Sequence, residues 1–189
     1  METVATPVAA RRSRTTATLA AAALFAVVAV IFLVSASDWY AVFKSVHVLA
    51  SVVWLGGGTI LILLGVLAQG RDDPHDLAQI AKQAAFCGER IFAPAGLVVV
   101  LMGISMMFNG DLEWGQFWVI AGLLGYAATF AIGLGYLSPL AKKITASVEQ
   151  NGVEHPETRA LVDRVLLVAR FDIAVLLLIV VDMVAKPFA

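Results

Sequence analysis

The sequence predicts an all-α fold, a polytopic membrane helix bundle with five transmembrane helices: a four-helix core and an N-terminal anchor helix. Composition is the first indication, because the 189 residues are 60% hydrophobic and 14% charged, whereas soluble domains have roughly 45–50% apolar and about 25% charged residues. The hydropathy pattern agrees. Crossing a ~30 Å hydrocarbon core takes about 20 mostly apolar residues, and five stretches of the sequence qualify. The alternation that is typical of membrane strands is missing from the sequence.

The first predicted span covers residues 16–36, and with the N-terminus before it forms the first expected part of the chain, residues 1–36. It has no charge after Arg14. Its basic start and the small residues Val34-Ser35-Ala36 also fit a signal peptide, but its apolar stretch is longer than the usual run of about 7–15 residues. We therefore expect an uncleaved anchor helix.

Four further spans form the expected core, residues 37–189. The second span has Lys44 as its only early charge, the third is short but uncharged, the fourth is apolar throughout, and the fifth is interrupted by charges. These spans cover residues 42–69, 91–108, 117–140 and 165–185. The charges inside the fifth span are Arg170, Asp172 and Asp182.

The connections between the core spans are also expected to contain helix. Residues 77–90 read as a helix that leads into the third span, after a turn in which Asp72 or Asp73 can cap it. Asn151-Gly152 marks a break, and Pro156 favours a helix start ahead of the fifth span.

Basic residues flank the spans unequally, which predicts the orientation of the bundle. Loops rich in Lys and Arg stay in the cytoplasm. The expected N-terminus is therefore cytoplasmic and the C-terminus external. The basic residues on the cytoplasmic side are Arg11, Arg12, Arg14, Arg71, Lys82, Arg90, Lys142, Lys143, Arg159 and Arg164.

Charge and cysteine content exclude several classes of function. A formal net charge of −1 offers no broad basic surface to a nucleic acid. A single cysteine excludes an internal disulfide framework and any multi-cysteine metal or iron–sulfur site. We expect the lipid bilayer, and no nucleic acid, among the partners of this chain.

One histidine lies inside a predicted span. His47, Ser51, Trp54 and Gly58 follow the i, i+4, i+7, i+11 spacing of one helix face. Polar groups at membrane depth are costly and usually face the bundle interior. His47 is therefore our first candidate, either as a ligand of haem or a metal ion or a proton carrier, or as a structural histidine that is bonded to a neighbouring helix.

A methionine on another span is predicted at the depth of this histidine. At ~1.5 Å per residue, His47 and Met102 each lie about 10 Å below the outer boundary. A His/Met pair on facing helices is able to hold a haem iron or a copper ion. Met102 and its neighbour Met106 are equally consistent with filling gaps in an apolar core.

Two sets of glycines predict close approaches between helices. Gly56, Gly57 and Gly58 are consecutive in the second span, and Gly125 and Gly133 lie in the fourth. Small residues let helices pack closely, within one chain or between copies in a homo-oligomer. The triple glycine also leaves room for a flat cofactor.

Charges at the fifth span are expected to form ion pairs. Asp182 and Lys186 are four residues apart, a spacing at which helical side chains neutralise each other. Asp172 is expected to pair with Arg90 or Arg164 rather than to catalyse a reaction.

Three segments carry a resemblance to a known family. They are His-Val-Leu-Ala-Ser-Val-Val-Trp-Leu-Gly-Gly-Gly at 47–58, Glu-Arg-Ile-Phe-Ala-Pro-Ala at 89–95 with Gly103, and Asp-Met-Val-Ala-Lys-Pro at 182–187. They resemble the family of domain of unknown function 2269, predicted bacterial integral membrane proteins without an assigned activity. The resemblance covers residues 39–188 and implies a location in a bacterial inner membrane.

More distant similarities concern the histidine segment. A histidine followed by Trp-Leu-Gly-Gly is similar to the copper resistance protein D family. Lys44-x-x-His47, Trp54 and Glu89-Arg90…Pro94 resemble the haem-containing membrane protoporphyrinogen oxidases, which implies haem b on His47. The second functional position of those oxidases has no matching lysine or histidine in a later helix of this chain.

These observations support three hypotheses of function. In the first, an integral membrane protein binds haem b or a metal ion in the outer half of the bundle, with His47, Trp54 and Met102 as cofactor-binding residues and His47 as the metal ligand. In the second, the protein is a haem-dependent oxidoreductase of the protoporphyrinogen oxidase type. In the third, it is a cofactor-free packing or assembly subunit that uses its glycines.

Overall fold

The computed structural model describes residues 38–71, 74–152 and 154–188, together with the isolated positions 23, 26, 27, 29–31 and 35. The first predicted span, 16–36, therefore lies largely outside the described residues, as do Asp72 and Asp73. The chain divides into two compact units, Met1–Val42 and Phe43–Ala189. The second unit contains the bundle and the candidate site.

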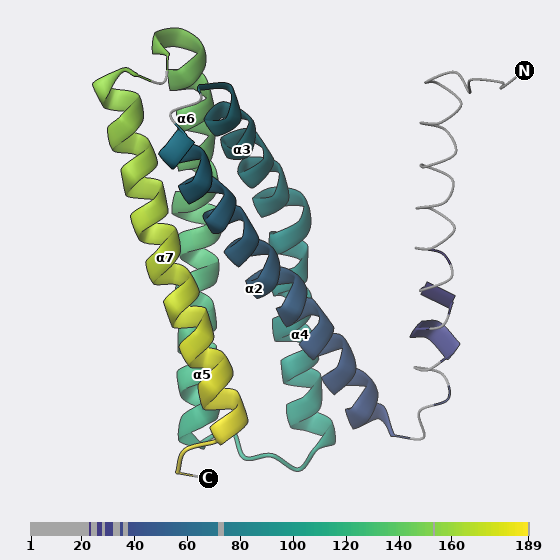
Figure 1. Ribbon diagram of the computed structural model, residues 1–189. Helices are drawn as coiled ribbons and strands as arrows, with labels where there is room; N and C mark the ends of the chain where they lie inside the picture. The colour runs from purple at the N-terminus through teal and green to yellow at the C-terminus, as the bar shows by residue number, and fades with distance from the viewer. Residues whose placement is uncertain are drawn as a thin grey trace, which may run out of the picture. The chain divides into compact units, whose positions relative to one another are not determined.

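The described residues form a helical bundle with no strand among them. Four long helical segments run alternately up and down (Figure 1). The first is α2, Trp39–Arg71, and the last is α7, Pro156–Ala185. The second consists of α3, Pro74–Cys87, a π-helical turn η1, Gly88–Phe92, and α4, Ala93–Asn109. The third consists of α5, Phe117–Ile132, a π-helical turn η2, Gly133–Leu137, and α6, Ser138–Asn151.

Three helical stretches among the described residues are long and apolar enough to cross a membrane, namely Trp39–Gly70, Gln79–Asn109 and Phe117–Asn151. They contain the second, third and fourth predicted spans. The fifth predicted span lies in α7, which has 30 residues but also the charges of Arg170, Asp172 and Asp182. The all-α membrane class is confirmed, whereas the count of five transmembrane helices stays a prediction.

One expected connection is confirmed and one boundary differs. As expected, the helix at 77–90 leads into the third span, within a continuous segment from Pro74 to Asn109, whereas the segment that contains the fourth predicted span continues past residue 140 to Asn151. Each of these two segments contains a π-helical turn, which absorbs an extra residue without ending the helix. The break at Asn151 and the helix start at Pro156 are confirmed, and Gly152 adopts the positive φ of 81° that glycine tolerates.

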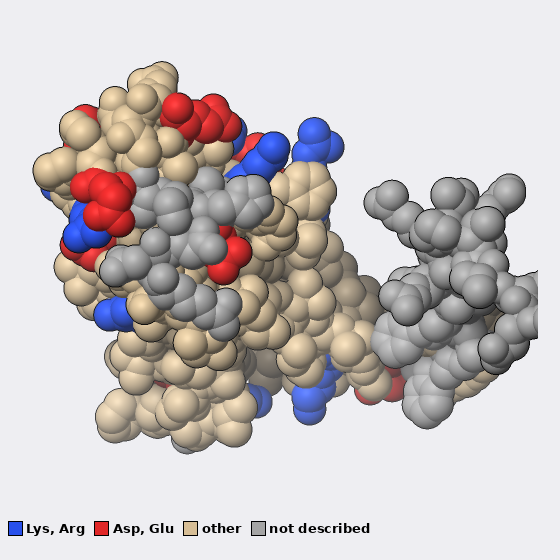
Figure 2. Space-filling model, turned by 45° about the horizontal axis from the view of Figure 1, so that its top comes forward, with Lys and Arg blue, Asp and Glu red and all other residues tan. Residues whose placement is uncertain are grey.

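The end of the bundle that holds the α2–α3 and α6–α7 connections carries charged side chains, and α2 is longer than the hydrocarbon core of a bilayer is thick. The 33 residues of α2 span about 50 Å at ~1.5 Å per residue, against a hydrocarbon core of ~30 Å. Acidic and basic side chains gather at this end (Figure 2), and Lys142 forms an ion pair with Glu89. Its interior is a small apolar core made of Ala68, Leu77, Ala81, Ile144, Val162 and Leu166.

Glycines of α2 let side chains from two neighbouring segments approach its backbone. A Cβ on Gly57 would lie 2.6 Å from Cε1 of Phe92, and a Cβ on Gly58 would lie 3.2 Å from Cδ1 of Ile173. A methyl group at Gly57 would therefore overlap an aromatic ring. The triple glycine is used, at least in part, for packing within the chain.

The other glycines that were candidates for a homo-oligomer differ in whether side chains of this chain pack against them. A Cβ on Gly125 would lie 2.7 Å from the side chain of Ile179 on α7, whereas Gly56 and Gly133 have no atom within 4 Å of that position. Contacts inside the chain thus occupy Gly57, Gly58 and Gly125. A homo-oligomer through the remaining glycines stays a prediction.

The neighbouring glycines Gly56 and Gly57 provide a matched test of this packing. We expect Gly57→Ala to lower the free energy of unfolding in detergent by about 1–3 kcal/mol, because overpacking costs that much. The gain in helix propensity, roughly 1 kcal/mol, offsets only part of this loss. Gly56→Ala receives the same gain without a clash and should unfold at the same temperature as the parent protein, or higher. Equal melting temperatures for the two variants would contradict the assignment.

Candidate functional site

The α2 face predicted from the sequence does point into the bundle. His47 contacts α4, Trp54 contacts α4 and α5, and Gly58 receives a side chain of α7. The hydroxyl of Ser51 donates to the carbonyl oxygen of His47 at 2.8 Å. The four residues therefore share one face, but their contacts lie at successive depths rather than around a single point.

His47 is held against the backbone of α4. Its Nδ1 lies 2.8 Å from the carbonyl oxygen of Val99, and because a carbonyl only accepts hydrogen bonds, Nδ1 must carry a hydrogen and donate it. Gly103 lies beside the ring, because a Cβ there would be in ordinary contact with Cε1 of His47 at 3.4 Å. The bond is the one that a structural histidine requires, and in the neutral ring it leaves the lone pair of Nε2 available.

The role of Met102 as a second ligand stays a prediction. Gly103 is a residue of α4 that lies beside the His47 ring, and consecutive helical residues point about 100° apart around the helix axis. The predicted equality of depth therefore does not by itself give Met102 the same direction. Among the described residues, no group of three or more His, Cys, Asp and Glu side chains is arranged to hold a metal ion.

Trp54 belongs to an aromatic cluster that lies about two helical turns after His47 along α2. Its ring meets Tyr126 edge-on with centroids 5.7 Å apart, and meets Phe130 edge-on at 6.1 Å. A Cβ on Gly96 would lie 3.0 Å from the Phe130 ring and 3.4 Å from the Trp54 ring. The absence of a side chain at Gly96 thus lets α2, α4 and α5 meet through aromatic rings.

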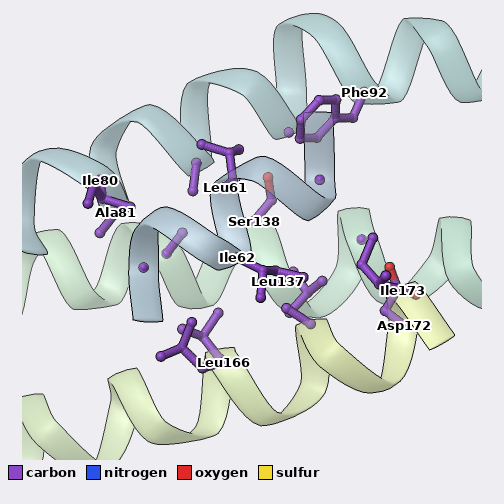
Figure 3. Close-up of a pocket in the computed structure, with 18 of the residues that line it drawn as sticks. Leu61, Ile62, Ile80, Ala81, Phe92, Leu137, Ser138, Leu166, Asp172 and Ile173 are labelled. Atoms are coloured by element: carbon purple, nitrogen blue, oxygen red, sulfur yellow. The ribbon is translucent and has the colours of Figure 1, made fainter. Parts of the chain in front are cut away.

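A cavity of about 170 Å³ lies between the helices (Figure 3). Trp54 lines it, but His47 does not. The wall is largely apolar, and its polar side chains are those of Trp54, Ser138 and Asp172. Of the three residues that the sequence assigned to one cofactor site, Trp54 lines this cavity, whereas His47 and Met102 do not.

Ser138 brings an unpaired hydroxyl to this cavity. Its Oγ is buried without a hydrogen-bond partner, whereas the hydroxyls of Thr59 and Ser105 each donate to the carbonyl four residues earlier. Ser138 directly follows η2, where π-helical pairing replaces the regular pattern. A Cβ on Gly88, in η1, would lie 2.9 Å from this Oγ, so the two π turns face each other.

Asp172 does not form the expected ion pair. Its side chain is 7% exposed, and its Oδ1 has no hydrogen-bond partner. Arg90 and Arg164 are exposed, and within the described residues neither pairs with Asp172. The reason is the rotation of α7 about its axis. Asp172 lies on the buried face that also carries Leu166 and Leu176, whereas both arginines are exposed.

Asp182 and Lys186 also do not neutralise each other. The Nζ of Lys186 lies 4.8 Å from the centroid of the Trp118 ring, and Oδ2 of Asp182 is buried without a partner. The i, i+4 expectation fails because α7 ends at Ala185 and Lys186 adopts a left-handed conformation. Its side chain therefore leaves the helix face of Asp182.

The helical bundle and its apolar surface define an integral membrane protein. Residues 41–187 match the family described as "Predicted integral membrane protein (DUF2269)", and the chain belongs to this family. Nothing among curated proteins or solved structures matches this chain. The more distant similarities to copper resistance and haem proteins stay predictions.

The hydrogen bond to Val99 predicts the protonation pattern of His47. We expect the ¹⁵N spectrum of histidine-labelled protein to show a protonated Nδ1 for His47, whereas free neutral imidazole side chains favour the proton on Nε2. The signal is assigned by its loss in His47→Ala, with His155→Ala as the control. An unprotonated Nδ1 in the folded protein would contradict the geometry.

Proposed function

We propose that this protein is a membrane-embedded binding protein that holds haem b through His47, in the outer half of the bundle. The observation that carries the proposal is the hydrogen bond from Nδ1 of His47 to the carbonyl of Val99. Histidines that bind iron commonly donate their other ring nitrogen in this way, which orients the ring and raises the basicity of the ligand. Nε2 of His47 would then be the ligand atom.

The donor set fits haem better than a free metal ion. A bare ion needs several protein ligands, and the described residues provide no cluster of them. Haem supplies four ligands of its own, so one axial histidine is sufficient. When bound, the group would add the capacity to take up and release an electron.

The second axial position is left open in this proposal. Helices α4 to α7 contain no histidine, so Met102 or Met106 is our candidate for a second ligand within the bundle. Without them, the haem iron would keep an open position or take a ligand from a second copy of the chain. The role of Trp54 would then be to shape the cavity rather than to touch the haem.

Haem titration tests this proposal. We expect the purified protein to develop a Soret band on addition of haem, and His47→Ala to weaken haem binding at least about tenfold, as expected when an axial ligand is lost. His155→Ala, in the α6–α7 connection, serves as the matched control and should bind haem like the parent protein.

Two results of this titration would overturn the haem proposal. One is a Soret band that His47→Ala leaves unchanged. The other is folded protein without a Soret band in excess haem, which would favour the cofactor-free packing subunit instead.

We also propose a topology of five spans in a bacterial inner membrane, with a cytoplasmic N-terminus and an external C-terminus. Residues 1–36 would be the N-terminal part with its anchor helix, and residues 37–189 the four-helix core. What supports this is that Lys82 lies in α3 and that Lys142 and Lys143 lie in α6, the helices that adjoin the α2–α3 and α6–α7 connections. The positive-inside rule makes the side of these connections cytoplasmic.

Cysteine labelling tests the topology in spheroplasts. In a Cys87→Ser background, Glu113→Cys lies in the α4–α5 connection and Glu154→Cys in the α6–α7 connection. We expect an impermeant maleimide to label position 113 in intact spheroplasts and position 154 only after lysis. The reverse pattern would mean the opposite orientation.

A further inference from the structure

The cavity contains an acidic group for which the described residues provide no counter-charge. Among the described residues that line it, Asp172 alone is ionisable. Its side chain is 7% exposed and its Oδ1 lacks a hydrogen-bond partner. Burial of a carboxylate in apolar surroundings is costly unless a cation or hydrogen-bond donors compensate it. A ligand that carries a positive charge and an N–H donor would supply both.

The remaining wall indicates what the body of such a ligand is like. Its side chains are mostly aliphatic or aromatic, and the rings of Trp54, Phe92 and Phe130 belong to it. Aromatic faces attract organic cations in addition to apolar groups. The volume of about 170 Å³ is close to that of an engineered apolar cavity of about 150 Å³ that binds benzene. A single ring with a short substituent is therefore of the right size.

We propose that this cavity binds a small lipophilic amine in its protonated form. The ammonium group pairs with the carboxylate of Asp172, and the apolar body lies against the aliphatic and aromatic wall. The unpaired hydroxyl of Ser138 is a second hydrogen-bond partner in the same wall. This site is separate from the haem site proposed above, because His47 does not line the cavity.

Both π-helical turns contribute residues to the wall of the cavity. Gly88 and Phe92 of η1 and Gly133 and Leu137 of η2 all line it. Turns of this kind disturb regular backbone pairing and occur frequently at functional sites. Here η2 leaves the Ser138 hydroxyl without its usual partner, so the feature that interrupts the helix also supplies a polar group to the cavity.

Benzylamine is the probe for this proposal, because it is one ring in size and protonated at neutral pH. Benzyl alcohol, which has nearly the same shape without the charge, is the neutral reference. Binding to the purified full-length protein in detergent is measured by calorimetry and by intrinsic tryptophan fluorescence, to which Trp54 in the cavity wall contributes. We expect benzylamine to bind at least about tenfold more tightly than benzyl alcohol, since charge-assisted hydrogen bonds are the stronger ones.

The variants separate the role of the carboxylate from that of the fold. Asp172→Asn keeps the shape and should weaken benzylamine binding about tenfold or more, while leaving benzyl alcohol binding unchanged. Asp172→Glu retains the charge and should retain part of the affinity, and Ser138→Ala should cause a smaller loss than Asp172→Asn. The matched control is Asp182→Asn, which removes another buried, unpartnered carboxylate of α7 outside the cavity and should not affect binding.

Two results would overturn the proposal. Equal binding of benzylamine and benzyl alcohol would show that the cavity is an apolar space without cation selectivity. Benzylamine binding that responds equally to Asp172→Asn and Asp182→Asn would place the amine outside this cavity. If Asp172→Asn does not fold, the comparison of Asp172→Glu, Ser138→Ala and the two probes on the parent protein still decides between these results.

Discussion

The close packing of side chains against glycine residues is the interaction on which the bundle and its candidate sites depend. In lipid, apolar side chains gain little from contacting each other rather than lipid, so helices associate through close fit. Gly57 receives a ring of Phe92, Gly96 receives rings of two helices, and Gly58 receives the side chain of Ile173. Side-chain contacts of this kind hold α2 against the neighbouring helices. The cavity lies beside these contacts.

The direction in which α2 faces was predictable, whereas the partners of its residues were not. The spacing of His47, Trp54 and Gly58 placed them on one face, and all three contact other helices. Depth along a helix follows from residue counting, but rotation about its axis depends on packing. For this reason residue counting could place His47 and Met102 at the same depth but could not identify Gly103 as a residue beside the ring.

The cavity and its polar groups were beyond sequence reasoning for a different reason. Ser138 resembles any helical serine in the sequence, and only the turn η2 removes its usual backbone partner. Asp172 was expected to pair with an arginine because charge matching ignores helix phase, yet the buried stripe of α7 carries it inward. The membrane class, by contrast, followed from composition and span length, because these properties are insensitive to such local geometry.

The π turns also have a consequence for comparing this chain with its relatives. Each turn holds one more residue than an α-helical turn would, so it acts as a one-residue insertion and shifts the following face by about 100°. The inward-facing positions before and after η1 or η2 therefore do not follow from one continuous α-helical spacing. An alignment that allows no gap at Gly88–Phe92 or Gly133–Leu137 would equate inward-facing residues of one protein with lipid-facing residues of another.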